Sequence, residues 1–464
     1  MLGIGLGLGI GIIGAEDGAP PAPYYAKYKA LMNEDLVATS PTGTPGTGSC
    51  VRALVANYTR ISDGLIVEAA INTARFQTNP NTNRPALLVE TESTNLAPYS
   101  KFMTTAAGQW SSYWDADTAD IVAPNGVAEA PNCHQQYGFG SYSLANSLVQ
   151  PVAGEYRTVS VYIKKLSADS APFARIQYKH RDGTFTRQYF NMTTNVPGAL
   201  HSGDVAPLHT YMEAAGNDWY RIGMTLVEAG GTATANGTVL IQTSNEAGGT
   251  FGTVAGEGTS YWGFQIEENV YMSSLIYTEA TAVTRPADRI DMPPVDAFID
   301  RTLGAYSCII HPLANSRDRV VYPNATQLIL AGDNGATYMM KSTDGSTYPN
   351  SNYQWSAGNS YVSGQYPGDT GDDERWCMTY NASGTEAFPG TKRYMWIDST
   401  KRPRVNNTLA DDLFTEFPAT TVLYIGYDGN VGSGFATPFP MLISDIKFWP
   451  ELTDAQALAV SQTG

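Results

Sequence analysis

Residues 157–166 have the sequence RTVSVYIKKL, a short apolar run rich in β-branched side chains. Three further runs of the same kind follow: FARIQYKH (173–180), WYRIGMTLVE (219–228) and GTVLIQTS (237–244). Asp-Gly and Asn-Gly pairs stand between such runs, and these dipeptides are typical of tight turns. Apolar runs that recur at this spacing predict the strands of an antiparallel β-sandwich.

The composition of the whole chain agrees with a β-rich protein. Its 464 residues predict two to four domains. They include 45 Gly, 27 Pro and 28 Tyr, which favour strands joined by many turns. The formal net charge of −16 lacks the basic footprint that duplex DNA binding needs, so we expect no nucleic-acid partner. A surface rich in Tyr, Asn, Ser and Thr suits neutral polar ligands such as sugars.

The four cysteines are too far apart for a structural zinc site, which needs ligands at close and repeated spacing. They are Cys50, Cys133, Cys308 and Cys377. We therefore expect buried free thiols. The strand-like runs also contain Trp219, Trp262, Trp376 and Trp449, which we expect in the core.

The first fourteen residues, MLGIGLGLGIGIIG, alternate glycine with aliphatic side chains. Period two predicts a strand, and a glycine face lets another backbone approach closely. We expect an assembly segment that adds to a sheet or packs beside its own copies, and a frayed tail is the alternative. The assembly residues would be Leu2, Ile4, Leu6, Leu8, Ile10 and Ile12.

Three other interpretations of this leader are rejected. The first basic residue is Lys27, so the positive region of a signal peptide is missing. The run is shorter than the roughly 20 apolar residues of a membrane helix, and we expect no membrane insertion. Residues 9–14 match GxGxxG, but the helix-breaking sequence AEDGAPPAP follows where a dinucleotide site needs a helix.

Residues 84–100, RPALLVETESTNLAPYS, are the first segment that resembles a known protein family. Together with YWGFQIE (261–267) and SLIYTEATAVTRPAD (274–288), this stretch resembles a β-sandwich module of bacteriophage virion proteins. Residues 218–222, DWYRI, are similar to a strand of carbohydrate-binding-module-like jelly rolls, and residues 58–60 and 72–76 fit the usual lead-in. The resemblance covers about residues 50–290.

The remaining residues resemble a concanavalin/laminin-G-like sandwich. The matching segments are RWCMTY (375–380), RYMWID (393–398), VLYIG (422–426) and MLISDIKFW (441–449). A short helix over residues 452–460 follows, with Thr453 as its N-cap. The turn after Trp396 is Asp-Ser here, where the family has Asp-Gly.

The resemblance implies an all-β chain with two antiparallel jelly-roll-like sandwiches in tandem. Residues 1–49, with the Gly-rich assembly strand and one short helix over residues 24–38, would attach the chain to a particle, and residues 50–290 and 291–464 would form the sandwiches. It implies a phage fibre or spike subunit that recognises bacterial surface polysaccharide, forms a homo-oligomer, commonly a trimer, and contacts other virion proteins. Such a subunit is located in the virion, is made in the host cytoplasm without a signal peptide, and is not an enzyme.

Other functions stay open at this point. The chain could be a purely structural decoration or tail subunit, whose sandwiches only pack. It could be a glycan-degrading enzyme, since paired carboxylates need only spatial proximity. An extracellular bacterial adhesin is disfavoured by the missing signal peptide. The sequence contains no GxSxG elbow, HExxH motif or P-loop.

Candidate ligand residues lie in two polar, aromatic-rich regions. A flat aromatic side chain takes the face of a sugar ring, and amides or carboxylates take its hydroxyl edge. The first region, residues 109–142, has a loop-like pattern, although Trp110 can also belong to the core. The second is residues 348–366. The candidates are Trp110, Tyr113, Trp114, Asp115, Gln135, Tyr137, Tyr353, Trp355 and Tyr361.

An acidic run near the second region is a candidate calcium site. Asp369, Asp372 and Asp373 supply hard oxygen ligands at high density, which Ca²⁺ prefers. The spacing does not match an EF-hand, and a solvated acidic loop is the alternative. We expect no other cofactor.

Overall fold

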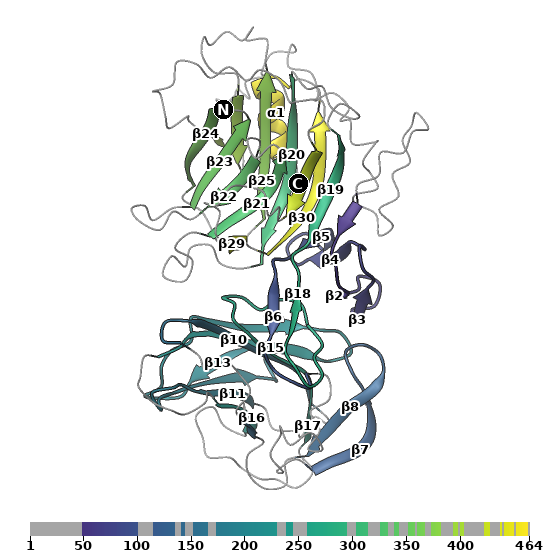
Figure 1. The fold of residues 1–464 in the computed structure, drawn as a ribbon, viewed down its shortest axis with the longest axis vertical. Helices are drawn as coiled ribbons and strands as arrows, with labels where there is room; N and C mark the ends of the chain where they lie inside the picture. The colour runs from purple at the N-terminus through teal and green to yellow at the C-terminus, as the bar shows by residue number, and fades with distance from the viewer. Residues whose placement is uncertain are drawn as a thin grey trace, which may run out of the picture.

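The computed structural model forms two lobes stacked along the long axis of the molecule (Figure 1). Within its described residues it contains thirty β-strands and one short helix, so the chain is mostly β, as the sequence predicts. The described residues are 49–100, 115–134, 141–143, 152–165, 173–229, 238–244, 258–294, 303–313, 325–332, 338–342, 351–357, 360–366, 373–381, 393–397, 400–402, 422–426, 437–438, 440–449 and 452–462.

The lower lobe in Figure 1 is built from two antiparallel sheets. The larger sheet contains, in spatial order, β14 (His209–Ala214), β15 (Tyr220–Val227), β10 (Tyr156–Lys165), β17 (Gly258–Glu267), β6 (Ser93–Asn95) and β18 (Val283–Arg285). β8 (Ala128–His134) pairs with β17 and with β7 (Asp115–Val122). The smaller sheet contains β13 (Val196–Leu200), β12 (Phe185–Asn191), β11 (Phe173–Lys179), β16 (Thr238–Ser244) and β9 (Ser141–Ser143).

The two lower sheets enclose one apolar core. Val159, Val161 and Ile163 point into it from β10, and Ile176 and Ile241 meet them from the smaller sheet. All five side chains are 0 % exposed. The four apolar runs of the sequence are thus the strands β10, β11, β15 and β16, and they form a β-sandwich.

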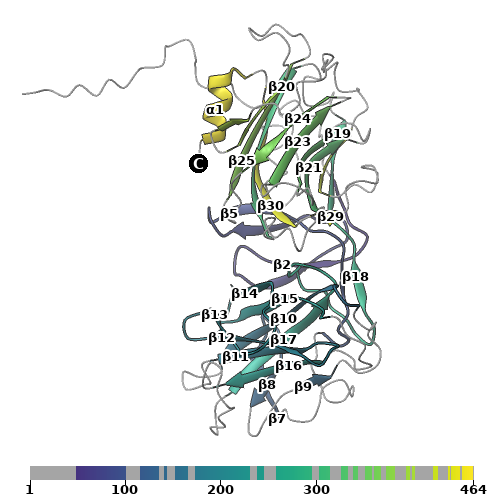
Figure 2. The same ribbon diagram turned by 90° about the vertical axis from the view of Figure 1, so that its left-hand side faces the viewer.

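The upper lobe also contains two facing sheets (Figure 2). The first contains β1 (Ser49–Val51), β19 (Arg289–Pro294), β28 (Val422–Gly426), β21 (Ala325–Gly332), β22 (Tyr338–Ser342), β23 (Ser351–Ala357) and β24 (Ser360–Tyr366), with β29 (Thr437–Pro438) beside β21. The second contains β27 (Thr400–Arg402), β26 (Arg393–Ile397), β25 (Glu374–Asn381), β20 (Leu303–Pro312), β30 (Met441–Trp449), β5 (Arg84–Val89) and β4 (Arg75–Asn79).

The predicted C-terminal helix is present as α1 (Asp454–Gln462). Thr453 caps it, since Gln456 N–H donates to Thr453 Oγ1 at 3.3 Å and Thr453 N–H donates to Gln456 Oε1 at 2.9 Å. Ala457 packs with Cys377 of β25 and Trp449 of β30. The four tryptophans expected in the core are buried, at 0–7 % exposure.

Strand pairing shows that the two sandwiches do not simply follow one another along the chain. β5 pairs with β30 and with β4, and β1 pairs with β19, so β1, β4 and β5, which precede residue 90, belong to the upper sheets. The chain then forms the lower sandwich and returns through β18 and β19. A tandem order with a boundary at residue 290 was expected, but the pairing crosses that boundary. The predicted particle-attachment segment, with all six of its aliphatic assembly residues, lies outside the described residues.

A small hairpin, β2 (Ala56–Thr59) with β3 (Ile66–Ala69), contacts both lobes. Ile66 packs into a lower-lobe cluster with Trp219 and Trp262, whereas Tyr58 packs against Leu88 of the upper lobe. Its turn touches the lower lobe at two glycines: a Cβ added to Gly216 would lie 2.6 Å from the carbonyl oxygen of Gly64. Gly216 also has a φ of +70°, so only glycine fits this contact without strain.

The described thiols match the expectation from the sequence. Cys50, Cys308 and Cys377 are buried, and none of them forms a disulfide within the described part of the chain. Among the described residues no helix is long and apolar enough to cross a membrane.

Candidate binding cleft between the lobes

Most of the ligand residues expected from the sequence are not located by the structure. Trp110, Tyr113, Trp114, Gln135 and Tyr137 lie outside the described residues. The other four lie on strands for which only the backbone is described, although a loop was expected for the first of them. They are Asp115 on β7, Tyr353 and Trp355 on β23, and Tyr361 on the neighbouring β24.

Of the three calcium candidates, Asp369 and Asp372 also lie outside the described part of the chain, and Asp373 is described. The Asp373 carboxylate accepts hydrogen bonds from the Nδ2 of Asn79 at 3.0 Å and of Asn81 at 3.2 Å. It also contacts His311 Nδ1 at 2.9 Å. These contacts join β4 to β20, and within the described residues no group of three or more His, Cys, Asp or Glu side chains is arranged to hold a metal.

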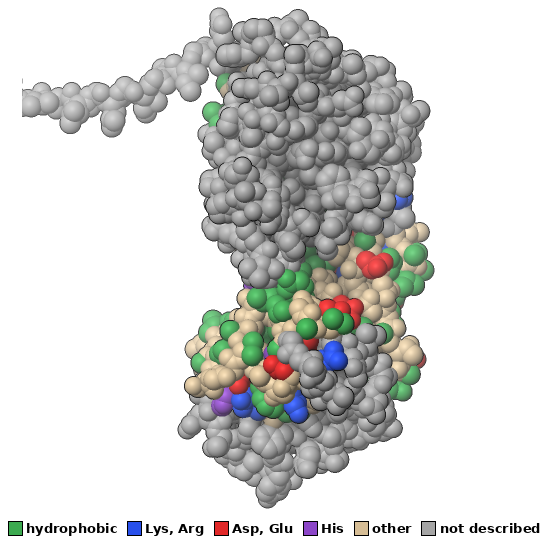
Figure 3. Space-filling view, turned by 60° about the vertical axis from the view of Figure 1, so that its left-hand side comes forward, with side chains coloured by type: hydrophobic (Ala, Val, Ile, Leu, Met, Phe, Trp, Pro, Cys, Tyr) green, Lys and Arg blue, Asp and Glu red, His purple; other side chains and the backbone are tan. Residues whose placement is uncertain are grey.

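A cleft lies between the two lobes. Its volume is about 690 Å³, including the part open to solvent. Side chains of both lobes and of the bridging hairpin line it: Asn57, Tyr58, Thr59, Ile66, Gln77, Leu88, Glu90, Tyr162, Tyr211, Glu213, Ala214, Ala215, Arg221, Met272, Ser274, Leu275 and Leu313. Figure 3 shows apolar and acidic side chains gathered at the level where the lobes meet.

Three polar side chains in the cleft walls are available to a ligand. Tyr58, Thr59 and Gln77 are half-buried, and within the described structure their side chains form no hydrogen bond. Tyr58 is held through its ring, which packs against Leu88 and Leu442. Its hydroxyl and the Gln77 amide therefore offer donors and acceptors at positions that the fold fixes.

The lower wall of the cleft is rigid. The Tyr162 ring meets Trp262 edge-on, with centroids 5.4 Å apart, and the Arg221 guanidinium lies 5.2 Å from the Tyr162 centroid. Arg221 donates to the Ser273 carbonyl at 2.5 Å and to Ser160 Oγ at 3.0 Å. These contacts hold the aromatic wall in one place, which reduces the ordering cost of binding.

Glu213 stands at the rim of the cleft, opposite Arg221 in the β14–β15 register. Its carboxylate forms no hydrogen bond to any described residue. The side chain is exposed, yet nearby protein atoms desolvate the carboxylate enough to raise the pKa of Glu213, an effect that Arg221 opposes.

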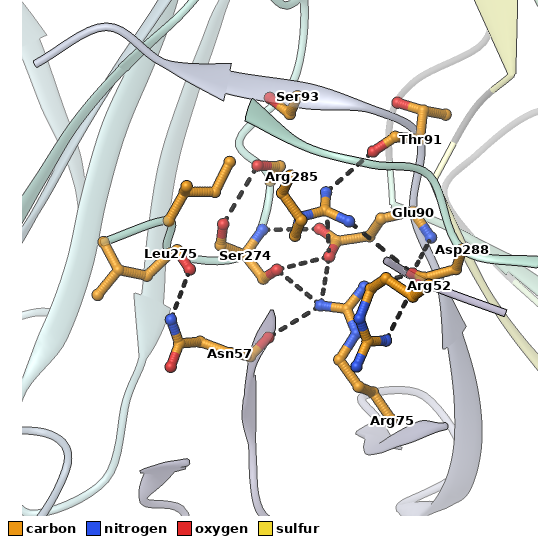
Figure 4. A network of polar contacts seen from close by, with 12 residues as sticks. Arg52, Asn57, Arg75, Glu90, Thr91, Ser93, Ser274, Leu275, Arg285 and Asp288 are labelled. Atoms are coloured by element: carbon orange, nitrogen blue, oxygen red, sulfur yellow. Dashed lines mark hydrogen bonds and ion pairs between the residues drawn. The ribbon is translucent and has the colours of Figure 1, made fainter. Parts of the chain in front are cut away.

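Beneath the cleft lies a buried set of ions, the junction cluster, formed by Arg52, Arg75, Arg285, Glu90 and Asp288 (Figure 4). Asp288 accepts from Arg52 at 2.9 Å and also from Arg75, and Glu90 is paired with Arg75 at 2.7 Å and with Arg285 at 3.5 Å. All five side chains are at most 3 % exposed. The cluster joins the places where the chain enters and leaves the lower lobe.

Hydrogen bonds satisfy most of the remaining donors and acceptors of the junction cluster. Ser274 donates to Glu90 from its backbone N–H at 2.7 Å and from its hydroxyl at 2.6 Å. Arg285 donates to the Thr91 carbonyl at 3.0 Å, and Arg52 donates to the carbonyls of Ala70 and Thr73, both at 3.0 Å. Because three guanidiniums face two carboxylates, these carbonyls help to balance the extra positive charge.

Glu90 should make stability depend on pH in the acid range. Burial alone would raise the pKa of Glu90, but Arg285, Arg75 and the Ser274 hydrogen bonds outweigh it and lower this pKa to about 2. The usual value is 4.5, so the unfolded chain binds the proton first, and about 3 kcal/mol of stability should be lost as the pH falls from 4.5 towards 2. Urea unfolding at successive pH values measures this loss.

Glu90→Gln should show a flatter acid slope than the parent protein, from a lower starting stability. Glu92→Gln is the matched control, since Glu92 is exposed two residues away. An unchanged slope in Glu90→Gln would contradict the assignment.

Distantly similar solved structures include a CBM40 domain and a pair of laminin G-like domains. No family model and no curated protein matches the chain. The CBM40 domain of a Ruminococcus gnavus IT-sialidase, solved with α2,3-sialyllactose, is 10 % identical; 35 % of this chain and 84 % of that chain are covered, with a TM-score of 0.25. Domains LG4–5 of the mouse laminin α1 chain are 10 % identical; 68 % of this chain and 88 % of that chain are covered, with a TM-score of 0.22.

The cleft residues were missed by sequence reasoning for a topological reason. Tyr58, Gln77 and Glu213 come from three separate strands, and the first two belong to a region interpreted only as a lead-in. The only local signal is the pair Tyr211 and Glu213. In a strand, residues two apart share a face, which puts an aromatic ring and a carboxylate side by side.

Proposed function

We propose that this chain is a glycan-binding subunit of a phage particle surface and that the cleft between its lobes holds the glycan. The observation that carries the proposal is the composition of the cleft, where tyrosine rings stand beside polar side chains that form no hydrogen bond within the described residues. Rings match the apolar faces of sugars, and free amides and hydroxyls match their edges.

The net charge supports a neutral or cationic glycan over a strongly anionic one. At −16 the chain repels polyanions over long distances. In this proposal residues 1–49 attach the subunit to the particle, and a homo-oligomer, such as a trimer, presents several clefts to bacterial surface polysaccharide. Several weak contacts then add up to useful avidity.

The particle role is supported by the resemblance of residues 84–100 and 274–288 to phage virion modules. The subunit would be made in the host cytoplasm and would have no catalytic activity of its own. A glycan array probed with the full chain tests the binding function. Binding to bacterial polysaccharides supports it, whereas complete silence favours a purely structural subunit, and release of sugar from the polysaccharide would reveal an enzyme.

Gln77→Ala is expected to weaken glycan binding about tenfold, the equivalent of 1.4 kcal/mol, because the amide then no longer bonds the sugar. The fold should be unaffected, since the Gln77 side chain bonds nothing in the described protein. Titration calorimetry with the best glycan from the array measures the affinity.

Thr78→Ala is the matched control for this variant. Thr78 is the next residue on β4, is equally half-buried and does not line the cleft, so its loss should leave the affinity unchanged. Equal weakening by both variants, or by neither, would place the glycan elsewhere.

A further inference from the structure

Glu213 is the carboxylate of the cleft that forms no hydrogen bond within the described residues. Glu90, the other acidic lining residue, is occupied by Arg75, Arg285 and Ser274. Glu213 has Arg221 opposite it in the strand register, but Arg221 donates to Ser273 and Ser160. The Glu213 side chain is exposed at the rim, so its carboxylate is open to a cation that enters the cleft.

Aromatic rings line the same cleft as this carboxylate. Tyr211 precedes Glu213 by two residues on β14, so both belong to one face of the strand, and both line the cleft. The Tyr211 hydroxyl is bonded to Thr225 Oγ1 at 3.2 Å, which fixes the ring. Tyr58 and Tyr162 line the same hollow. A carboxylate among tyrosine rings suits an ammonium group, which gains both an ion pair and cation–π contacts.

Two other charged residues line the cleft, Glu90 and Arg221, and Arg221 partly offsets the charge of Glu213. Arg221 comes from β15, and it is the cationic residue among those that line the hollow in the described structure. It is 6 % exposed and lies against the Tyr162 ring, so its charge is directed away from solvent. No lysine of the described residues lines the cleft. An incoming carboxylate would therefore meet Glu213 without a free cation to receive it.

We propose that the cleft selects sugars that carry a free, protonated amine and that Glu213 binds this ammonium group. The inference rests on the proposed glycan-binding function and narrows its ligand class. N-acetylation removes the positive charge from the amine, so acetylated sugars of the same shape should bind more weakly. Sugars that carry a carboxylate should bind most weakly of all.

Two trisaccharides that differ only in the acetylation of their amines test the inference. They are the β-1,4-linked trimer of glucosamine and its fully N-acetylated form. With the full chain at pH 6, where most amines of such a sugar are protonated, calorimetry should show the glucosamine trimer bound at least tenfold more tightly. In Glu213→Gln the preference should fall to about twofold or less, because the amide is neutral. Glu279→Gln is the control, since Glu279 is exposed and does not line the cleft.

The outcomes of this experiment distinguish a failure of the selection by Glu213 from a failure of the glycan-binding function. Equal affinity for the two trimers, or a preference that persists in Glu213→Gln, overturns the selection by Glu213. Binding of other glycans on the array with no binding of the glucosamine trimer overturns it too but leaves the glycan-binding function standing. If no glycan binds at all, the proposed function fails together with the inference.

Discussion

Replacing Asp288 with alanine is expected to lower the free energy of unfolding by about 3–5 kcal/mol, because buried guanidiniums lose their partner. Arg52 and Arg75 both donate to this carboxylate, and the backbone N–H of Glu90 donates to it at 2.9 Å. Without Asp288, three buried guanidiniums share the single carboxylate of Glu90. Water cannot replace the lost partner cheaply, since these side chains are almost fully enclosed.

Urea unfolding, followed by tryptophan fluorescence, measures this loss. Asp63→Ala is the matched control, because Asp63 forms an ion pair with Arg60 that is 37–42 % exposed. Exposed pairs contribute about 0–1 kcal/mol, so this control should stay close to the parent protein. A loss below about 1 kcal/mol in Asp288→Ala would mean that the junction cluster does not stabilise the fold.

Replacing Trp262 with alanine is expected to cost about 3–5 kcal/mol, the usual range for a large aromatic side chain in a core. Trp262 is 0 % exposed and contacts the rings of Tyr162 and Tyr277 edge-on, at centroid distances of 5.4 and 5.9 Å. It belongs to the same cluster as Ile66 of the bridging hairpin. The cavity would therefore open where the hairpin meets the lower sandwich, directly behind the aromatic wall of the cleft.

Trp262→Ala should also weaken ligand binding, because Tyr162 loses the ring that supports it. Val196→Ala is a suitable control: Val196 is 49 % exposed on β13, and surface changes of this kind stay within about 0.5 kcal/mol. Trp262→Phe keeps part of the volume and should lie between the two in stability. If Trp262→Ala were as stable as Val196→Ala, the apolar cluster around Trp262 could not be what holds the bridging hairpin against the lower lobe.

Local patterns in the sequence predicted the local elements well. Val159, Val161 and Ile163 lie in strand β10 and are fully buried, because apolar side chains at period two need a covered face. Thr453 forms the predicted cap of the C-terminal helix, since a cap depends on only a few neighbouring residues. Trp219 and Trp262 are in the core, as their strand patterns indicated.

The order of the sandwiches and the site could not be predicted in this way. The contact between Arg52 and Asp288 joins residues 236 positions apart, and nothing near either residue in the sequence indicates the other. A buried arginine looks like any surface arginine in a sequence, because burial of a charge depends on partners that only the fold brings together. The same holds for the cleft, whose walls come from several separate parts of the chain.

The route of the chain through the lower lobe has a consequence for how such proteins diversify. The lobe begins with β6 and ends with β18, and these strands pair with each other, with Thr94 opposite Thr284. Both crossing points lie together at one boundary (Figure 1). The lower sandwich is thus an inserted domain whose two ends lie next to each other. Recombination can replace such a domain with another one, and the sheets of the upper lobe keep all of their strands.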